Sequence, residues 1–198
     1  MTRVYSFEKE LEFSRIYETV IEPHLKQIDR FRYVRFETEK QKQLDDIDFM
    51  FDLKPIRPNT VELKIRRPVS NKYDDIVVET WSVYGKKLGW GLGSTAEFII
   101  YAKLDRSYTA FSRAFLLETA KLREWLLAHI DDARYPKFIT NTVAKGGRFS
   151  SEFMVVPLSD ATAFAQEIKI ELTEAEKKWV RERLAELRAG GSFGRNAF

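Results

Sequence analysis

Two short segments of this sequence combine alternating apolar residues with side chains that can do chemistry. In the segment 47–51 every second residue is apolar, and Asp48 lies between the first two of them. In the segment 61–65 the apolar residues alternate in the same way, and Glu62 and Lys64 occupy the positions between them. Because side chains alternate between the two faces of a β-strand, Glu62 and Lys64 are predicted to share the polar face of one strand.

Two carboxylates beside a lysine suit the hydrolysis of a phosphodiester bond. If the two strands are neighbours, Asp48 and Glu62 can converge on one divalent cation, which polarises a phosphate oxygen and lowers the pKa of a bound water. Lys64 can then orient or deprotonate that water, or stabilise negative charge on the phosphate. The pattern therefore predicts a metal-assisted hydrolytic site.

The composition restricts which metal such a site can hold. The 198 residues include no cysteine and only two histidines, His24 and His129, which excludes thiolate zinc sites and multi-histidine sites. Carboxylate ligands favour hard ions, so we expect Mg²⁺, with Mn²⁺ as an alternative. The net charge of +3 is weak support for a nucleic-acid partner. Ten basic residues lie between Lys40 and Lys87, where they form either a phosphate-facing surface or a solvated charged face.

The bulk composition predicts a single folded domain over residues 1–189. We expect a core at about residues 7–130, C-terminal strands and a helix within 137–189, and a flexible tail at 190–198. No apolar run approaches the roughly 20 residues that cross a bilayer, and the first residues lack the apolar segment of a signal peptide. These features predict a cytosolic protein with no membrane partner.

The apolar periodicity predicts an α/β fold, with a tendency towards α+β, in which helices flank a mixed central sheet. Three helices are predicted at residues 6–27, 107–131 and 173–188, the last with a capping box formed by Thr173 and Glu176. Strands are predicted at residues 31–37, 47–53, 60–66, 76–81, 96–102, 137–143 and 153–157. Short connections indicate that the early strands pair antiparallel as a meander.

An acid on one strand, followed fourteen positions later by Glu62-Leu63-Lys64 on the next, resembles the PD-(D/E)xK nuclease superfamily. The resemblance covers roughly residues 7–102, which follow the helix-then-strands order of that superfamily. It implies a restriction-endonuclease-like fold in which Asp48 and Glu62 are metal ligands and Lys64 is the catalytic lysine. Ile47 stands where the motif's proline precedes the acid, which prevents a match to one subfamily.

Further residues resemble positions in phage-encoded nucleases of this group. There a glutamine precedes the acid, as Gln43 does here, and a later strand carries a glutamate, as Glu79 does. Glu79 either extends the metal site and positions Lys64, or is a solvent-facing residue at a strand end. In the junction-resolving branch a glutamate of the N-terminal helix joins the site, and the sequence does not decide between Glu8 and Glu10.

The glycine-rich segment 85–94 carries three candidates for nucleic-acid contact, Lys86, Lys87 and Trp90. It matches neither a phosphate-binding P-loop nor a dinucleotide fingerprint, because the spacing differs and an apolar strand follows instead of a helix. The two lysines can hold a phosphate backbone while Trp90 stacks on an unpaired base. The alternative is a glycine-rich hairpin in which Trp90 caps the core.

These observations together predict a Mg²⁺-dependent endonuclease that acts on DNA and comes from a phage or a mobile element. Branched DNA such as a Holliday junction is an attractive substrate, and resemblance to the junction resolvases implies a homodimer. A first alternative is a non-catalytic module that binds nucleic acid or protein and retains the nuclease fold. A second is an enzyme that cleaves another phosphate ester.

Overall fold

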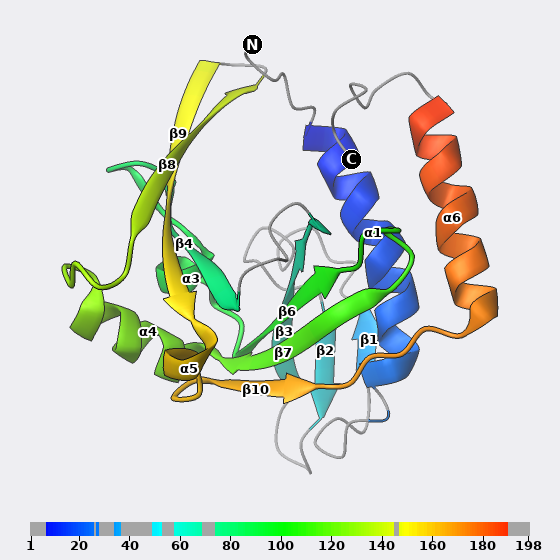
Figure 1. Cartoon of the computed structure of the whole chain (residues 1–198), viewed down its shortest axis with the longest axis horizontal. Coiled ribbons are helices and arrows are strands. Elements are labelled where there is room, and N and C mark those ends of the chain that lie inside the picture. Colours follow the sequence, from blue (N-terminus) through cyan, green and yellow to red (C-terminus); the bar gives the residue numbers. More distant parts are fainter. Residues whose placement is uncertain are drawn as a thin grey trace.

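The computed structural model describes residues 7–25, 27, 34–36, 49–52, 58–68, 74–144 and 147–189. Two β-sheets and flanking helices make up this part of the chain, so the predicted mixed α/β class is confirmed. Figure 1 shows the six-stranded sheet in the middle, two long helices beside it and the four-stranded sheet on the other side. The proposed tail at 190–198 lies outside the described residues.

The six-stranded sheet has the strand order β1-β2-β3-β6-β7-β10. Strands β1 and β2 pair antiparallel, as do β2 and β3, so the expected meander is present in the first three strands only. Strand β3 then pairs in parallel with β6, which pairs antiparallel with β7, and β10 adds antiparallel to β7. The strands are β1 (Val34–Phe36), β2 (Phe49–Asp52), β3 (Pro58–Arg66), β6 (Phe98–Leu104), β7 (Phe111–Glu118) and β10 (Ala165–Ile168).

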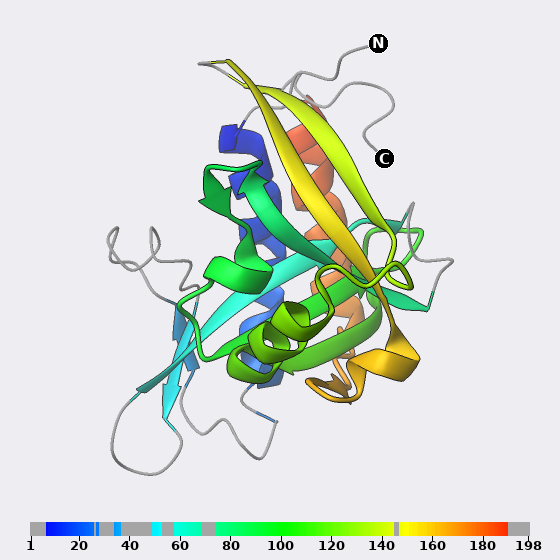
Figure 2. The same cartoon turned by 90° about the vertical axis from the view of Figure 1, so that its left-hand side faces the viewer.

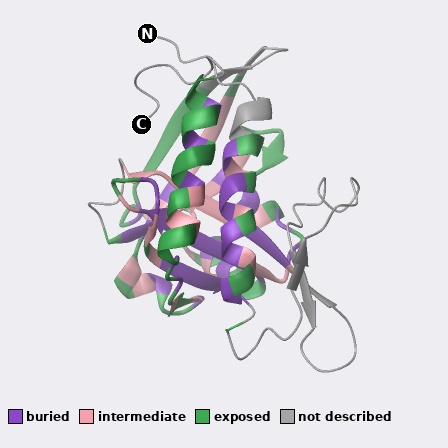
Figure 3. Ribbon diagram, turned by 90° about the vertical axis from the view of Figure 1, so that its right-hand side faces the viewer, coloured by how far each residue is buried: buried purple, intermediate pink, exposed green. Residues whose placement is uncertain are grey.

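Helices α1 (Phe7–Leu25) and α6 (Glu174–Ala189) cover one face of this sheet. Their apolar sides join alternate residues of the central strands in one core, which includes Tyr17, Ile21, Val61, Leu63, Ile100 and Leu184. Figure 3 shows buried residues on the inner sides of both helices and exposed residues along the outer sides. Helix α6 therefore covers the sheet of its own chain with the face that includes Trp179 and Leu184.

A side-chain contact joins the two helices where α1 ends and α6 begins. The Thr173 hydroxyl accepts from the backbone N–H of Glu176 at 3.3 Å, and the Glu176 carboxylate accepts from the backbone N–H of Thr173 at 2.7 Å. This capping box was predicted from the sequence and is confirmed. The same carboxylate lies 3.2 Å from Nε2 of His24, which is buried in the last turn of α1.

A four-stranded antiparallel sheet covers the opposite face of the six-stranded sheet, with the order β5-β4-β9-β8. Its strands are β4 (Asp75–Val83), β5 (Lys87–Leu88), β8 (Lys137–Ala144) and β9 (Gly147–Pro157), accompanied by helices α3 (Trp90–Gly93), α4 (Thr119–His129) and α5 (Leu158–Ala161). A second core, with Val78, Tyr101, Leu117, Leu126 and Met154 among its members, fills the space between these layers. Figure 2 shows this sheet with α3 and α4 on the side of the molecule away from α1 and α6.

Two expectations need correction. A single central sheet was expected, whereas the chain leaves that sheet after β3 and builds a separate one from β4 onwards. A helix was expected over residues 107–131, but Phe111–Glu118 is strand β7 and the helix begins at Thr119. A spacing of four residues, such as that of Phe111 and Phe115, fits one helical turn and two strand repeats alike, so the pattern was ambiguous.

Within the described residues, no helix combines the length and the apolar character needed to cross a bilayer.

Candidate functional site

Strand β3 presents its polar side chains on the face that points away from the two long helices. Val61 and Leu63 belong to the core beneath α1 and α6, so the alternation along the strand turns Glu62 and Lys64 to the other face. Glu62 is only 1% exposed, and its carboxylate forms an ion pair with the Lys64 ammonium. The Lys64 side chain is 31% exposed, so this end of the pair is accessible to solvent. The predicted pairing of Glu62 and Lys64 on one strand face is therefore present.

The second predicted acid, Asp48, directly precedes strand β2, which pairs with β3. Phe49 of β2 lies opposite Val61 of β3, and Asp48 and Glu62 are their respective chain neighbours. Asp48 itself lies outside the described residues, as does Gln43. Their contribution to the site remains a prediction from the sequence.

Next to Lys64, a buried tyrosine connects the two sheets. Tyr101 lies opposite Lys64 on β6 and is 3% exposed. Its hydroxyl accepts a hydrogen bond from the Arg66 guanidinium at 2.8 Å and another from the backbone N–H of Val77 on β4 at 3.1 Å. Burial raises the pKa of Tyr101 and outweighs the lowering by Arg66, so the hydroxyl is neutral at physiological pH.

Asp75 at the start of β4 faces two cations of the six-stranded sheet. Its carboxylate lies 3.8 Å from the Arg66 guanidinium and 3.7 Å from the Lys103 ammonium. Lys103 is 2% exposed, and burial lowers its pKa while Asp75 opposes that change. Because a buried charge needs a compensating partner, this cluster fixes how β4 sits against β3 and β6.

Glu79 lies on the same face of β4 as Asp75, four residues further along the strand. Asp75, Val77 and Glu79 share one face of that strand, and Asp75 contacts the face of β3 that carries the acid–lysine pair. Glu79 is half-buried, and its side-chain stem and carbonyl lie against Gly89. A Cβ at Gly89 would approach the Glu79 carbonyl oxygen to 2.3 Å, so only glycine fits beside this part of β4.

The glycine-rich segment places its three candidates in different surroundings. Lys86 is exposed in the turn between β4 and β5, and Lys87 is exposed at the start of β5. Trp90 is 8% exposed and packs in the second core, with its ring centroid 6.2 Å from that of Tyr101. The structure therefore supports the alternative in which Trp90 packs in the core. A buried ring in this position is not available to stack on a base.

The described residues supply one of the proposed carboxylate ligands. Among them, no group of three or more His, Cys, Asp or Glu side chains is arranged to hold a metal ion. The carboxylate of Glu62 has the donor chemistry that Mg²⁺ prefers, and the second ligand, Asp48, lies beyond the described part. The side chains of Glu8 and Glu10 are not described either, so their participation stays a prediction.

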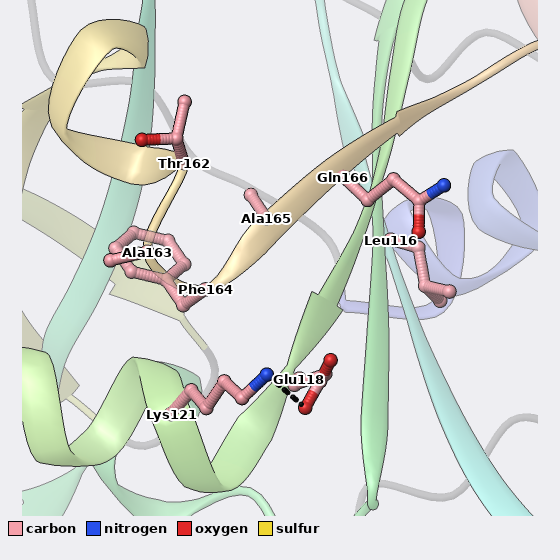
Figure 4. A pocket seen from close by; sticks show the side chains of 8 residues that line it. All are labelled: Leu116, Glu118, Lys121, Thr162, Ala163, Phe164, Ala165 and Gln166. Atoms are coloured by element: carbon pink, nitrogen blue, oxygen red, sulfur yellow. Dashed lines mark ion pairs between the residues drawn. The ribbon is translucent and has the colours of Figure 1, made fainter.

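A small open pocket lies at another place in the fold. Figure 4 shows it between β7, the start of α4 and the connection from α5 to β10, with an ion pair of 2.9 Å between Glu118 and Lys121 on its wall. None of its lining residues belongs to the sequence-predicted site. The pocket is therefore separate from the acid–lysine pair.

Four residues of the charged region were not singled out as site residues from the sequence: Arg66, Asp75, Tyr101 and Lys103. For two of them a signal was present, because Tyr101 and Lys103 are polar residues at alternate positions of an otherwise apolar strand. The sequence does not reveal that Asp75 lies against β3, since that contact depends on the packing of two sheets.

Comparison with known proteins adds no relative: no protein-family model, no curated protein and no solved structure matches this chain.

Proposed function

We propose that this protein is a Mg²⁺-dependent endonuclease that hydrolyses phosphodiester bonds of DNA. The observation that carries the proposal is the ion pair of a 1% exposed glutamate with a partly exposed lysine, on the polar face of strand β3. Burying a carboxylate is costly, and a protein that needs only stability is served as well or better by apolar residues there. The resemblance of Asp48, Glu62 and Lys64 to the PD-(D/E)xK pattern supports the same reaction class.

Each side chain has a distinct part in this proposal. Asp48 and Glu62 hold the ion, which when bound supplies Lewis-acid polarisation of the scissile phosphate. Lys64 orients the attacking water and places a positive charge beside the phosphate as negative charge develops. Glu79 positions Lys64, and Lys86 and Lys87 contact the phosphate backbone.

The substrate and assembly follow from the same resemblance. We propose branched DNA, such as a Holliday junction, as the substrate and a homodimer as the active form. A junction presents two symmetry-related strands, and a two-fold symmetric dimer places one Glu62–Lys64 pair at each of them.

The test is cleavage of supercoiled plasmid and of a synthetic four-way junction, with Mg²⁺ and with EDTA. Glu62→Gln and Lys64→Ala should each lower the rate by about 100-fold or more, the loss typical of a removed transition-state contact. The matched controls are Glu171→Gln and Lys169→Ala, because these residues form an acid–lysine pair two positions apart with side chains 71% and 78% exposed. Both controls should cut like the wild type.

The alternative function is a non-catalytic nucleic-acid-binding or interaction module. It predicts junction binding that survives in EDTA, with no cutting in Mg²⁺ or Mn²⁺. That result would refute the nuclease proposal. Cleavage of small phosphate esters, with DNA left intact, would instead identify an enzyme of another substrate class.

A further inference from the structure

Strand β8 lies at the edge of the four-stranded sheet, with β9 on one side and no described strand on the other. Figures 1 and 2 show that the hairpin of β8 and β9 extends from the body of the molecule. An edge strand presents a row of backbone N–H and C=O groups that can pair with a strand of another chain. Whether it does so depends on the length of the edge and on the residues that protect it.

The other three edge strands that the structure describes are short, and each includes a charged residue. Strands β1, β5 and β10 have three, two and four residues, and they include Arg35, Lys87 and Glu167 respectively. Short length and charge are common means of preventing edge-to-edge pairing. Strand β8 has eight residues, its pairing with β9 runs without a bulge, and residues 138–144 include no charge and no proline. The edge of β8 therefore lacks the usual protection.

Apolar side chains are exposed on both faces of β8. Phe138 is 42% exposed and Ile139 is 52% exposed. Because neighbouring residues of a strand point to opposite faces, the described part of the chain leaves both faces of β8 partly open at this point. The ring of Phe138 stacks on that of Phe153 of β9 at a centroid distance of 5.3 Å, which supports it against the sheet. Large apolar side chains beside an unprotected edge are typical of an interface between chains.

The pairing with β9 shows which backbone groups of β8 lie at the free edge. Just before β8, the backbone N–H of Val155 donates to the Pro136 carbonyl at 3.0 Å. The N–H and C=O of one residue point to the same edge of a strand and successive residues alternate, so the even-numbered residues of β8 direct these groups to β9. Residues 137, 139, 141 and 143 direct theirs to the free edge. A two-fold axis at Thr140 carries this set onto itself, with 139 opposite 141 and 137 opposite 143.

The charge of β8 also suits a second copy of the same strand. Its one charged residue is Lys137, whose ammonium lies 3.9 Å from the Glu152 carboxylate of β9. In antiparallel pairing about Thr140, Lys137 of one copy lies opposite Val143 of the other, so the two lysines are about 20 Å apart along the strands. Self-pairing therefore brings no like charges together, whereas a charged peptide would find no opposite charge between residues 138 and 144.

We propose that β8 pairs antiparallel with β8 of a second copy of this chain, about a two-fold axis at Thr140. The two four-stranded sheets then join into one continuous sheet, and each outward N–H of β8 meets a C=O of the other copy. Ile139 lies opposite Asn141 of the other copy and diagonal to its Ile139. Because this contact uses the same edge in both copies, assembly stops at the dimer. The inference rests on the proposed function only for the homodimer, whose interface it names.

The first experiment is sedimentation velocity over a range of protein concentrations, in EDTA and without DNA. The wild type should sediment as a dimer. Ile139→Lys should weaken the dimer by roughly 10-fold or more, because it places two like charges diagonally across the axis. In the single chain the new lysine lies opposite Glu152 of β9, so the fold is retained. The matched control is Leu127→Lys, the same kind of change at a 64% exposed residue of α4, which should dimerise like the wild type.

A cross-link tests the register without disturbing the fold. The chain has no cysteine, so Thr140→Cys introduces a single thiol. Across the proposed axis residue 140 faces its own copy in a non-hydrogen-bonded pair with Cα atoms about 4.5 Å apart, which is within the range of a disulfide. Oxidised glutathione should therefore convert Thr140→Cys into a covalent dimer on a non-reducing gel. Thr162→Cys, at an exposed residue after α5, should stay monomeric under the same conditions.

Three results would overturn the inference. The first is a wild type that is monomeric at every concentration. The second is a dimer as stable in Ile139→Lys as in the wild type, because the contact would then lie on another surface. The third is equal cross-linking of Thr140→Cys and Thr162→Cys, which would reflect random collision.

The two proposals fail separately. If the dimer depends on Ile139 but no DNA is cut in Mg²⁺, the nuclease proposal falls and the β8 interface stands. If Lys64-dependent cleavage is observed while the protein is monomeric, the β8 interface falls and the nuclease proposal stands.

Discussion

Replacing Lys64 by alanine should destabilise the fold as well as abolish cleavage, because the mutation removes the cation that faces a buried carboxylate. Glu62 has a side chain that is 2% exposed, whereas that of Lys64 is 31% exposed. Removing one member of a fully buried pair costs about 3–5 kcal/mol. Solvent at the lysine end of the pair reduces this cost, so we expect Lys64→Ala to lower the free energy of unfolding by about 2–3 kcal/mol.

The assay is reversible thermal or urea unfolding of four variants: Lys64→Ala, Glu62→Gln, the double variant and Lys169→Ala. The expected loss corresponds to a melting temperature about 4–12 °C lower for a chain of this length. Glu62→Gln removes the buried charge, so the double variant should recover most of the stability that Lys64→Ala loses. Lys169→Ala, at a 78% exposed site, should stay within about 0.5 kcal/mol of the wild type.

The same assay tests the metal. A ligand that binds only the folded state raises the melting temperature. Mg²⁺ should therefore stabilise the wild type and have a smaller effect on Glu62→Gln. The reasoning is refuted if Lys64→Ala is as stable as Lys169→Ala, or if the double variant is no more stable than Lys64→Ala, since the pair would then not be energetically coupled.

Three further substitutions test two contacts beside the site and the cap of helix α6. Gly89→Ala should cost about 1–3 kcal/mol in urea unfolding, because its Cβ would meet the Glu79 carbonyl oxygen at 2.3 Å. Asp75→Asn should destabilise the protein more at pH 7 than near pH 10. Burial lowers the pKa of Lys103 in the folded protein below the ordinary value of 10.5. Between these two pKa values the unfolded chain binds one proton more than the folded protein, so stability rises with pH. Removing Asp75 lowers the pKa of Lys103 further and extends this pH range downwards. Equal losses at both pH values would contradict this. Thr173→Ala should cost about 1 kcal/mol through loss of the helix cap, measured by thermal unfolding.

Much of the fold could be predicted from local patterns. The capping box located the start of α6, and the alternation of apolar residues located β3 and the face on which Glu62 and Lys64 lie. Strand β7 was missed, because its apolar residues are buried on both faces and their spacing also fits a helix. Trp90 was ambiguous for a related reason: an aromatic residue in a glycine-rich segment carries no signal of whether it packs inwards.

The acid–lysine pair is a property that the sequence by itself determined. Residues two apart on a strand share a face whatever the strand packs against, so Glu62 and Lys64 had to be neighbours once β3 formed. The tertiary structure decided what surrounds them. The burial of Glu62 and the contact of Asp75 with Arg66 both result from the meeting of two sheets. Those contacts depend on how separate strands and sheets pack together, and no local periodicity encodes them.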